Sequence, residues 1–298
     1  MSKNSTNKTV GLIGLGLMGS ALSRRLLDGG FNVVGFDIDP DKRNAFEKLG
    51  GEPVESIADV ASCCRRVLIA VMTVAQVEDV VAEILKHPSP SNKRRIVMSV
   101  ATSEPDRIEA LANESVTKGL DFLDTPVSGT SKQVLNGDGH GLIGGDPDVA
   151  KASADILDAI YPNRSVTGAA GSATKTKLAI NHILGLNRVA LAEGLVFAET
   201  LGLEKATFLD VAKKSAAYAQ IMDVKGGTMV SGDFSNPVSK ISQHLKDVRI
   251  MLNEAKQGSQ PLPMLSTLAE ILEASEQHGD GDQDNAITIN EIRRRKKP

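Results

Sequence analysis

Short apolar runs alternate with amphipathic stretches through the first half of the chain. The runs TVGLIGLG, FNVVGFDI, RRVLIAVM and RRIVMSV have the length and composition of buried strands, and helical stretches lie between them. In SALSRRLLDGG, for example, Leu22, Leu26 and Leu27 share one helical face, and two glycines end the segment. Strands that alternate with helices, without hairpin signals, predict right-handed crossovers and a doubly wound, mostly parallel sheet.

The second half of the chain follows a helical period instead. After about residue 165 the strand signal ends, and ATKTKLAINHILGLNRVALAEGLVFAETLG keeps a helical period far beyond the ~12 residues of a mean helix. KATFLDVAKKSAAYAQIM, VSKISQHLKDVRIMLNEAKQ and MLSTLAEILEASEQHG predict further helices. We therefore expect an α/β domain over residues 1–168 and an all-α domain over residues 169–298, joined by a long interdomain helix, with a substrate cleft between them.

Composition and charge narrow the classes of partner. Hydrophobic residues make up 41% of the chain and charged residues 24%, and the net charge of −3 argues against nucleic-acid or anionic-membrane partners. The polar start MSKNSTNKTV has no apolar signal region, and no apolar run reaches the ~20 residues of a membrane span. Neither the neighbouring Cys63 and Cys64 nor the five histidines show metal-ligand spacing, so we expect buried thiols, no metal and a cytoplasmic location.

A glycine-rich segment lies between the first predicted strand and its helix. Gly14, Gly16 and Gly19 form G-x-G-x-x-G, in which the first glycine allows a tight turn, the second lets a pyrophosphate approach and the third lets the helix pack on the strand. The helix N-terminus adds free N–H groups and a partial positive charge. The motif predicts a dinucleotide-binding segment made of Gly14, Leu15, Gly16, Leu17, Met18 and Gly19.

An acidic residue at the end of the second strand indicates which dinucleotide binds. Asp37 follows Gly14 by 23 residues, near the ~20 typical of this motif, and its carboxylate can accept from both ribose hydroxyls of NAD. A 2′-phosphate there would meet negative charge, and Asp37-Ile38-Asp39 has no arginine to neutralise it. We expect NAD as the cofactor and consider NADP less favoured.

A lysine and an amide stand at the start of the long helix. In GSATKTKLAIN, Lys177 and Asn181 are spaced i, i+4 and share one face, whereas Lys175 points elsewhere. Such a pair suits hydroxyl/carbonyl redox chemistry, in which the lysine relays the alcohol proton and the amide holds the oxygen. This role requires a lysine whose pKa lies well below the usual ~10.4, which burial can achieve.

Four ordered segments resemble motifs of the β-hydroxyacid dehydrogenase family, which includes 3-hydroxyisobutyrate dehydrogenases, tartronate semialdehyde reductases and sulfolactaldehyde reductases. GLIGLGLMGSALSRRLL is similar to the family's dinucleotide fingerprint, and DTPVSGT, followed by NGDGHGLIGGD, to its D-x-P-V-S-G-G loop and small-residue strand. GSATKTKLAIN matches G-x-x-x-x-x-K-x-x-x-N, and HLKDVRIM resembles a late K-D-L motif. Four motifs in order are far more specific than any one alone.

The resemblance implies a fold, an activity and a set of site residues. The fold is a Rossmann-type domain with a helical C-terminal domain, as in 6-phosphogluconate dehydrogenase, and the activity is NAD(P)-dependent interconversion of a small β-hydroxy acid and its semialdehyde, in a homodimer or homotetramer. Lys177 would be the catalytic lysine and Asn181 its amide partner. Ser128, Gly129 and Thr130 would hold the substrate carboxylate. Cofactor contacts are implied for Val71, Met72, Thr102 and Lys246.

The chain also departs from the family pattern. Val71 and Met72 replace a Leu-Pro pair, from which we expect a looser loop on the adenosine side. Thr130 replaces a second glycine and is followed by Ser131 and Lys132, and this hydroxyl and cation favour a more polar or doubly anionic substrate, such as a sulfonate. The chain has no tryptophan, whereas the family has one near the C-terminus, and Tyr218 lies in that general region.

Two alternatives compete with the dehydrogenase hypothesis. An imine reductase has the same architecture but usually replaces the lysine, and a catalytically silent dinucleotide-binding module would be expected to lose it. Lys177 is present, which favours the dehydrogenase.

Overall fold

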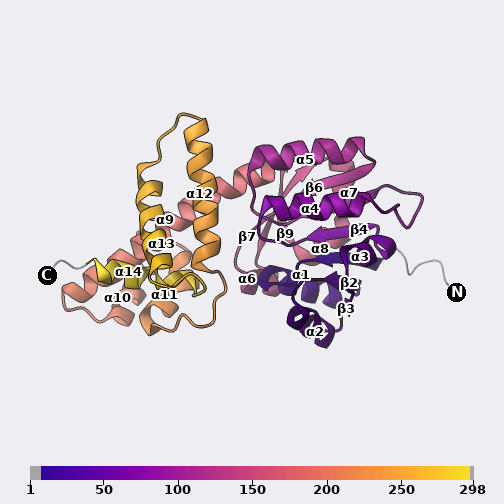
Figure 1. Ribbon diagram of the computed structural model, residues 1–298. Coiled ribbons are helices and arrows are strands. Elements are labelled where there is room, and N and C mark those ends of the chain that lie inside the picture. The colour runs from indigo at the N-terminus through magenta and orange to yellow at the C-terminus, as the bar shows by residue number, and fades with distance from the viewer. Residues whose placement is uncertain (1–7, 296–298) are drawn as a thin grey trace. The chain divides into compact units, whose positions relative to one another are not determined.

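The computed structural model describes residues 8–295, so most of the polar start discussed above lies outside the described residues. The chain divides into two compact units, one up to Lys177 and one from Leu178 onwards (Figure 1). We call them the α/β unit and the helical unit and describe each by itself.

The α/β unit is built on one sheet in the order β3-β2-β1-β4-β5-β6-β8-β7, with β9 paired to β8. From β3 to β6 all neighbouring strands are parallel, which confirms the predicted doubly wound sheet. The strands are β1 (Thr9–Ile13), β2 (Asn32–Phe36), β3 (Glu52–Pro53), β4 (Arg66–Ile69), β5 (Arg95–Ser99), β6 (Leu120–Asp124), β7 (Val127–Ser128), β8 (His140–Gly145) and β9 (Asn163–Gly168).

Helices cover both faces of this sheet, and side chains alternate between two cores. Leu12 and Leu68 pack into a cluster with α1, whereas the next residues, Ile13 and Ile69, pack into a cluster with α3, α4 and α5. The helices are α1 (Leu17–Asp28), α2 (Pro40–Lys48), α3 (Ile57–Cys63), α4 (Val74–Leu85), α5 (Pro105–Thr117), α6 (Ser131–Asn136), α7 (Pro147–Ala152) and α8 (Ala154–Ile160).

The last strands of the sheet break the parallel pattern. β8 runs antiparallel to β6 and β7, and β9 then runs parallel to β8. Glycines make this edge possible, because a Cβ at Gly141 would lie 2.5 Å from the Tyr161 ring and one at Gly144 2.8 Å from the carbonyl oxygen of Ala169. β8 therefore packs closely against the segment that leads into the next helix.

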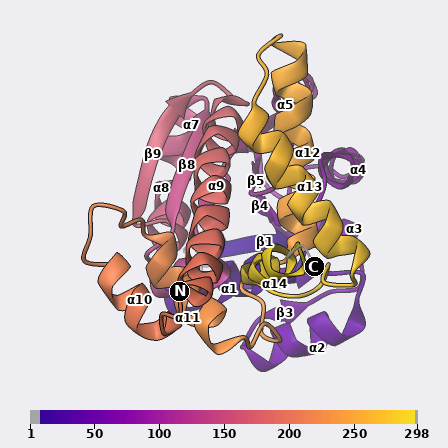
Figure 2. The same cartoon turned by 90° about the vertical axis from the view of Figure 1, so that its left-hand side faces the viewer.

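The helical unit contains the long predicted helix and five shorter helices in the described residues. α9 (Ser172–Thr200) begins in the α/β unit and continues without a break into the helical unit. The remaining helices are α10 (Lys205–Ala212), α11 (Ile221–Ser231), α12 (Ile241–Gln257), α13 (Pro263–Gln277) and α14 (Thr288–Arg294), with a 3₁₀ turn over Asn285–Ile287. α12 and α13 lie side by side in both views (Figures 1 and 2).

Two expectations need correction. KATFLDVAKKSAAYAQIM is helical only at its two ends: it contains α10 and the first two residues of α11, with a non-helical segment between them. In that segment the Ser215 hydroxyl donates to the carbonyl of Ala212 and accepts from the Ala217 N–H, which ends the helical hydrogen bonding there. The two cysteines are not both buried: Cys64 lies in the core next to α3, and Cys63 is exposed. Both are free thiols.

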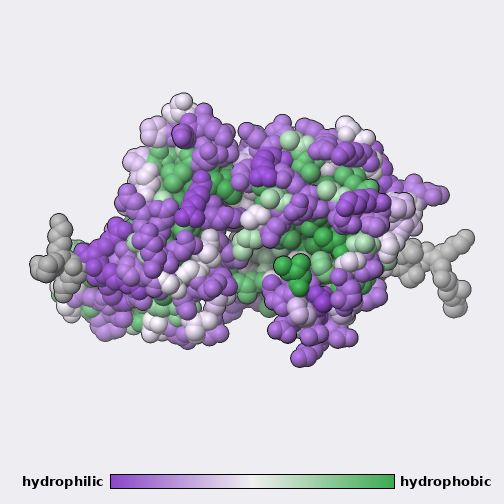
Figure 3. Space-filling model, in the orientation of Figure 1, coloured by the Kyte–Doolittle hydropathy of each residue, from purple (hydrophilic) through white to green (hydrophobic). Residues whose placement is uncertain are grey.

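The surface agrees with the composition. Hydrophilic residues cover most of the visible face of each unit (Figure 3). Among the described residues, no helix combines the length and the apolar character that crossing a bilayer requires.

Candidate functional site

The carboxyl ends of five parallel strands bring the predicted cofactor residues to one edge of the α/β unit. In spatial order, β2 leads to Asp37, β1 to Gly14, β4 to Val71, β5 to Thr102, and β6 ends at Asp124. From β1 the chain adds β2 and β3 on one side of the sheet, and then β4, β5 and β6 on the other side. The strand order therefore reverses between β1 and β4, and ligands of doubly wound sheets bind at this switch point.

The three motif glycines have three different environments. Gly14 has φ +93°, and a Cβ there would lie 2.5 Å from the carbonyl oxygen of Ala70. A Cβ at Gly19 would overlap the carbonyl oxygen of Gly14, so the helix could not pack on the turn. A Cβ at Gly16 would meet nothing within 4 Å. Close contacts within the protein therefore account for glycine at positions 14 and 19. No such contact accounts for Gly16, and the open space beside it fits a ligand such as a pyrophosphate.

The start of α1 has the character of an anion site. Gly16 is the N-cap, and no side chain caps the first turn, so the N–H groups of Leu17, Met18 and Gly19 have the orientation that phosphates bind. Leu17 is 40% exposed, in keeping with an open loop. The residues present thus fit the dinucleotide that the sequence motif predicts.

Asp37 ties the glycine loop to the second strand. Its side chain is almost buried, and its carboxylate accepts from the N–H of Leu15 at 2.8 Å and from that of Asp39 at 3.0 Å. The nitrogen of Lys42 lies 3.5 Å from the same carboxylate. Asp37 therefore has a structural role in the loop, and its predicted contact with ribose stays a prediction.

The cations near Asp37 are already engaged with acidic or carbonyl oxygens. Lys42 Nζ also lies 3.8 Å from Asp39, and Arg43 donates to the carbonyl of Asp37 at 2.7 Å and to Glu55 at 3.0 Å. Ile38, between the two aspartates, is 85% exposed. The end of β2 therefore presents carboxylates, and the neighbouring cations already have carboxylate or carbonyl partners.

The loop after β4 is held by a capping box. Thr73 caps α4, and the Oε1 atom of Gln76 accepts from the N–H groups of both Met72 and Thr73 at 3.0 Å. A proline at position 72 could not donate this hydrogen bond. Val71 and Met72 are thus anchored through Gln76, a residue that the sequence analysis did not single out.

The predicted substrate loop follows β6 and uses one of its own members as a cap. Ser128 lies on β7 opposite His140, and Gly129 has φ +149°, where other residues are strained. Thr130 caps α6, and its N–H and hydroxyl both donate to Oε1 of Gln133, at 2.9 and 3.1 Å. The structure gives Thr130 a capping role, and the contact of these residues with a carboxylate stays a prediction.

Asp124 was missed by the sequence analysis as a site residue, although it begins the DTPVSGT motif. Its carboxylate is fully buried and accepts three hydrogen bonds from the start of α9, from Gly171 N–H, Thr174 N–H and the Thr174 hydroxyl. Burial raises the pKa of this carboxyl to about 6, and the hydrogen bonds from Thr174 and Gly171 act in the opposite direction.

Lys177 and Asn181 lie on α9, four residues apart, and both side chains are nearly buried at 7% and 6% exposure. In the helical unit, Asn181 Nδ2 donates to Asp247 at 2.9 Å, and Lys246 Nζ lies 3.1 Å from the same carboxylate. Asp247 therefore orients the predicted amide, a role that its place beside Lys246 in the late motif did not reveal. The predicted cleft between the domains stays a prediction.

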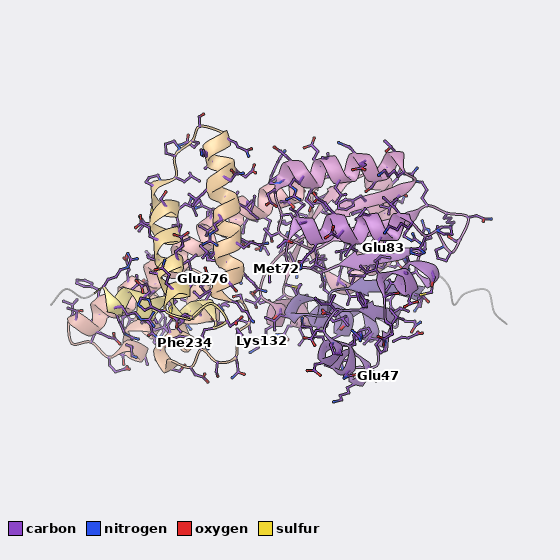
Figure 4. All side chains as sticks on the ribbon, in the orientation of Figure 1. Glu47, Met72, Glu83, Lys132, Phe234 and Glu276 are labelled. Carbon is purple, nitrogen blue, oxygen red and sulfur yellow. The ribbon has the colours of Figure 1, made fainter. Side chains whose placement is uncertain are left out.

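Two of the residues named with the departures from the family pattern, Lys132 and Tyr218, lie at the surface. Lys132 is exposed on α6 (Figure 4), and Tyr218 is 51% exposed in the helical unit, where its hydroxyl donates to Asp223 at 2.6 Å. The hydrogen bond to Asp223 raises the pKa of Tyr218. Over residues 8–295, no group of three or more His, Cys, Asp or Glu side chains is arranged to hold a metal ion.

Comparisons with known proteins cover both halves of the chain. Residues 9–168 match the family model of the NAD binding domain of 6-phosphogluconate dehydrogenase, and residues 171–292 match that of the NAD-binding of NADP-dependent 3-hydroxyisobutyrate dehydrogenase. The chain is 28% identical to an L-threonate dehydrogenase of Cupriavidus necator, over 95% of both chains. It is 27% identical to a 2-hydroxy-3-oxopropionate reductase of Escherichia coli, over 94% of this chain and 95% of that protein.

A solved structure supports the fold. A 3-hydroxyisobutyrate dehydrogenase from Salmonella typhimurium superposes with a TM-score of 0.86 at 24% identity, over 95% of this chain and 99% of that one. The fold, the ordered motifs and the two family models agree over nearly the whole length. The chain therefore belongs to the β-hydroxyacid dehydrogenase family of NAD(P)-binding oxidoreductases that act on CH–OH groups.

Proposed function

We propose that this protein is an NAD-dependent dehydrogenase that interconverts a small β-hydroxy acid and its semialdehyde, with Lys177 as the proton relay. The observation that carries the proposal is that Lys177 is nearly buried, at the beginning of a helix whose first turn is bonded to the end of β6. An imine reductase or a silent module is less well supported, because both hypotheses expect the lysine to be lost.

Each candidate residue has a distinct part in this reaction. The nicotinamide, when bound, accepts or supplies the hydride. Lys177 Nζ takes the proton of the substrate hydroxyl during oxidation and returns it during reduction. Asn181 donates one amide hydrogen to Asp247 and keeps its second N–H and its oxygen for the substrate hydroxyl. Ser128 and the N–H groups of the loop that follows it would bind the carboxylate.

The proposal of NAD rather than NADP rests on the end of β2. Asp37 and Asp39 place two carboxylates there. Lys42 lies near both of them, and Arg43 donates to the backbone carbonyl of Asp37 and to Glu55. A 2′-phosphate would have to bind among these acidic groups without an uncommitted cation in this loop. Ribose hydroxyls, by contrast, are neutral groups that can donate hydrogen bonds to a carboxylate.

Relatives of this chain are named for small hydroxy acids, among them L-threonate and 2-hydroxy-3-oxopropionate. These names support a small anionic substrate for this protein. We further infer a homodimer or homotetramer, supported by exposed apolar residues of the helical unit such as Ile183, Phe197 and Leu201. The free thiols Cys63 and Cys64 are in keeping with a cytoplasmic location.

The test of the proposed function compares two neighbouring lysines. Turnover is measured by nicotinamide absorbance with 3-hydroxyisobutyrate, serine, glycerate, threonate and sulfolactate, and NADH affinity by fluorescence. Lys177→Ala should lower kcat at least ~100-fold, the scale of a lost general acid–base group, and leave the NADH Kd within twofold. Lys175→Ala is the matched control, because Lys175 is more than half exposed and only 3.5 Å from Glu109. Turnover retained by Lys177→Ala would refute the lysine mechanism.

The cofactor proposal has its own test. Asp37→Asn keeps an acceptor for the Leu15 N–H and removes the negative charge, so the ratio of kcat/KM for NAD to that for NADP should fall about tenfold, the effect of ~1.4 kcal/mol. Asp59→Asn, an exposed carboxylate at the start of α3, is the control. A natural preference of the unsubstituted protein for NADP would contradict this proposal.

A further inference from the structure

The first turn of α9 is capped by a residue that lies about fifty positions earlier in the chain. The carbonyl of Gly171 accepts from the N–H of Lys175 at 2.9 Å, as an N-cap residue does, and Ser172 begins the helix, so Thr174 is the third helical residue. N–H groups of the first turn have no partner within the helix and need an acceptor from outside. Asp124 Oδ2 accepts from the N–H of Gly171 at 3.2 Å and from that of Thr174 at 2.8 Å.

The hydroxyl of Thr174 completes this connection. It donates to the other carboxylate oxygen, Asp124 Oδ1, at 2.9 Å. Asp124 and Thr174 are both fully buried, so water cannot replace any of these hydrogen bonds. The carboxylate therefore fixes both the height and the rotation of the helix start relative to the end of β6.

The strand end that carries Asp124 is itself held on the opposite side. Thr125 donates to the carbonyl of Ser99 through its N–H at 2.7 Å and through its hydroxyl at 3.0 Å. The Tyr161 hydroxyl donates to the carbonyl of Thr125 at 3.3 Å. Asp124 is thus attached to a rigid part of the sheet and transmits that position to α9.

Candidate functional residues lie close to these contacts along the chain. Lys177 lies three residues after Thr174, about 4.5 Å along the helix axis, and Ser128 lies four residues after Asp124. We propose that Asp124 is a positioning residue that sets the lysine of α9 relative to the substrate loop after β6. The inference rests on the proposed function of Lys177 and assigns Asp124 no contact with substrate or cofactor.

Replacement of Asp124 by asparagine should displace the helix start without unfolding the sheet. The amide oxygen of an asparagine can accept from the two N–H groups, but its nitrogen then donates to the Thr174 hydroxyl, whose own proton loses its acceptor in a fully buried site. Near-attack geometry is sensitive to shifts of about 1 Å. We expect Asp124→Asn to lower kcat 10- to 100-fold and to leave the NADH Kd within twofold, because the glycine loop after β1 is untouched.

The experiment measures kcat, KM, NADH Kd and the thermal midpoint for a matched set of variants. Asp121→Asn makes the same substitution at the other end of β6, where the carboxylate pairs with Arg94, and should behave like the unsubstituted protein. Thr174→Val removes one hydroxyl donor and keeps the N–H, so kcat should fall two- to fivefold. Thr174→Ser restores the hydroxyl and should restore kcat. The substrate used is the acid of the panel that the unsubstituted protein oxidises fastest.

The outcomes separate this proposal from the proposed function. If Lys177→Ala keeps its turnover, the lysine mechanism fails and the positioning role fails with it. If Lys177→Ala is inactive while Asp124→Asn keeps kcat within twofold, only the positioning role is overturned. A parallel loss of kcat, NADH affinity and thermal midpoint in Asp124→Asn also overturns it, since that pattern indicates general unfolding rather than displacement of one group.

Discussion

Gly16 gives the sharpest test of whether the glycine loop binds a dinucleotide. Its φ of −69° is available to any residue, and an added Cβ would meet no protein atom within 4 Å. Replacing it by alanine should therefore cost the fold little, under about 1 kcal/mol for an N-cap position at which glycine is favoured over alanine. The substitution should instead weaken the binding of the ligand.

The expected loss of affinity follows from the geometry. A pyrophosphate must come close to the backbone N–H groups at the start of α1, and a methyl group at position 16 would occupy that space. Overpacking by one methyl costs about 1–3 kcal/mol. The NADH Kd of Gly16→Ala should therefore rise about 5- to 150-fold.

The assay combines fluorescence titration of NADH with thermal unfolding, using two further glycines as references. In Gly19→Ala the new Cβ overlaps the carbonyl oxygen of Gly14, so both stability and affinity should fall. Gly227 on α11 has open space and lies in the helical unit, so Gly227→Ala should leave the NADH Kd unchanged. NADH binding by Gly16→Ala within twofold of the unsubstituted protein would refute the assignment of this space to the ligand.

Three further predictions concern charged side chains. Lys225→Met should lower the unfolding free energy in urea by about 3–5 kcal/mol, because the carboxylate of Asp284, 2.7 Å away, would stay buried without this cation. The partly exposed pair of Lys213 and Asp223 is the control, and Lys213→Met should cost under ~1 kcal/mol. Burial lowers the pKa of Lys225 from 10.5 to about 8, so the folded state loses this proton first and stability should rise between pH 8 and 10 in the unsubstituted protein but not in Lys225→Met. Lys132→Ala should raise KM for a sulfonate acid about tenfold, the effect of ~1.4 kcal/mol, and an unchanged KM for every acid would refute a contact between Lys132 and the substrate.

Strong local signals made much of the fold predictable from the sequence. The apolar runs around β1, β2, β4 and β5 and the glycines of the first turn each occur within one short window. The apolar signal is missing from strands that contain charged residues or several glycines. β6 (LDFLD) carries two aspartates and β8 (HGLIGG) three glycines, so neither resembles an apolar run, and their antiparallel pairing could not be expected.

Long-range hydrogen bonds account for what was missed in the site. Asp37 was predicted to bind ribose, but its bond to the Leu15 N–H depends on β1 and β2 lying side by side. Asp124 meets Thr174 across 50 positions, and Asn181 meets Asp247 across 66. No spacing rule within a helix or strand links such residues, so their roles become visible only once the chain is folded.

The unbroken course of α9 restricts how chains of this family can change in length. An α-helix turns by about 100° per residue, so a single residue inserted between Lys177 and Asn181 would move Lys177 off the face that it shares with Asn181. Asn181 would keep its hydrogen bond to Asp247, because both residues lie in the helical unit. The loop between α12 and α13, by contrast, has no such angular constraint on its length. Insertions and deletions among relatives should therefore accumulate in such loops and spare the opening turns of α9.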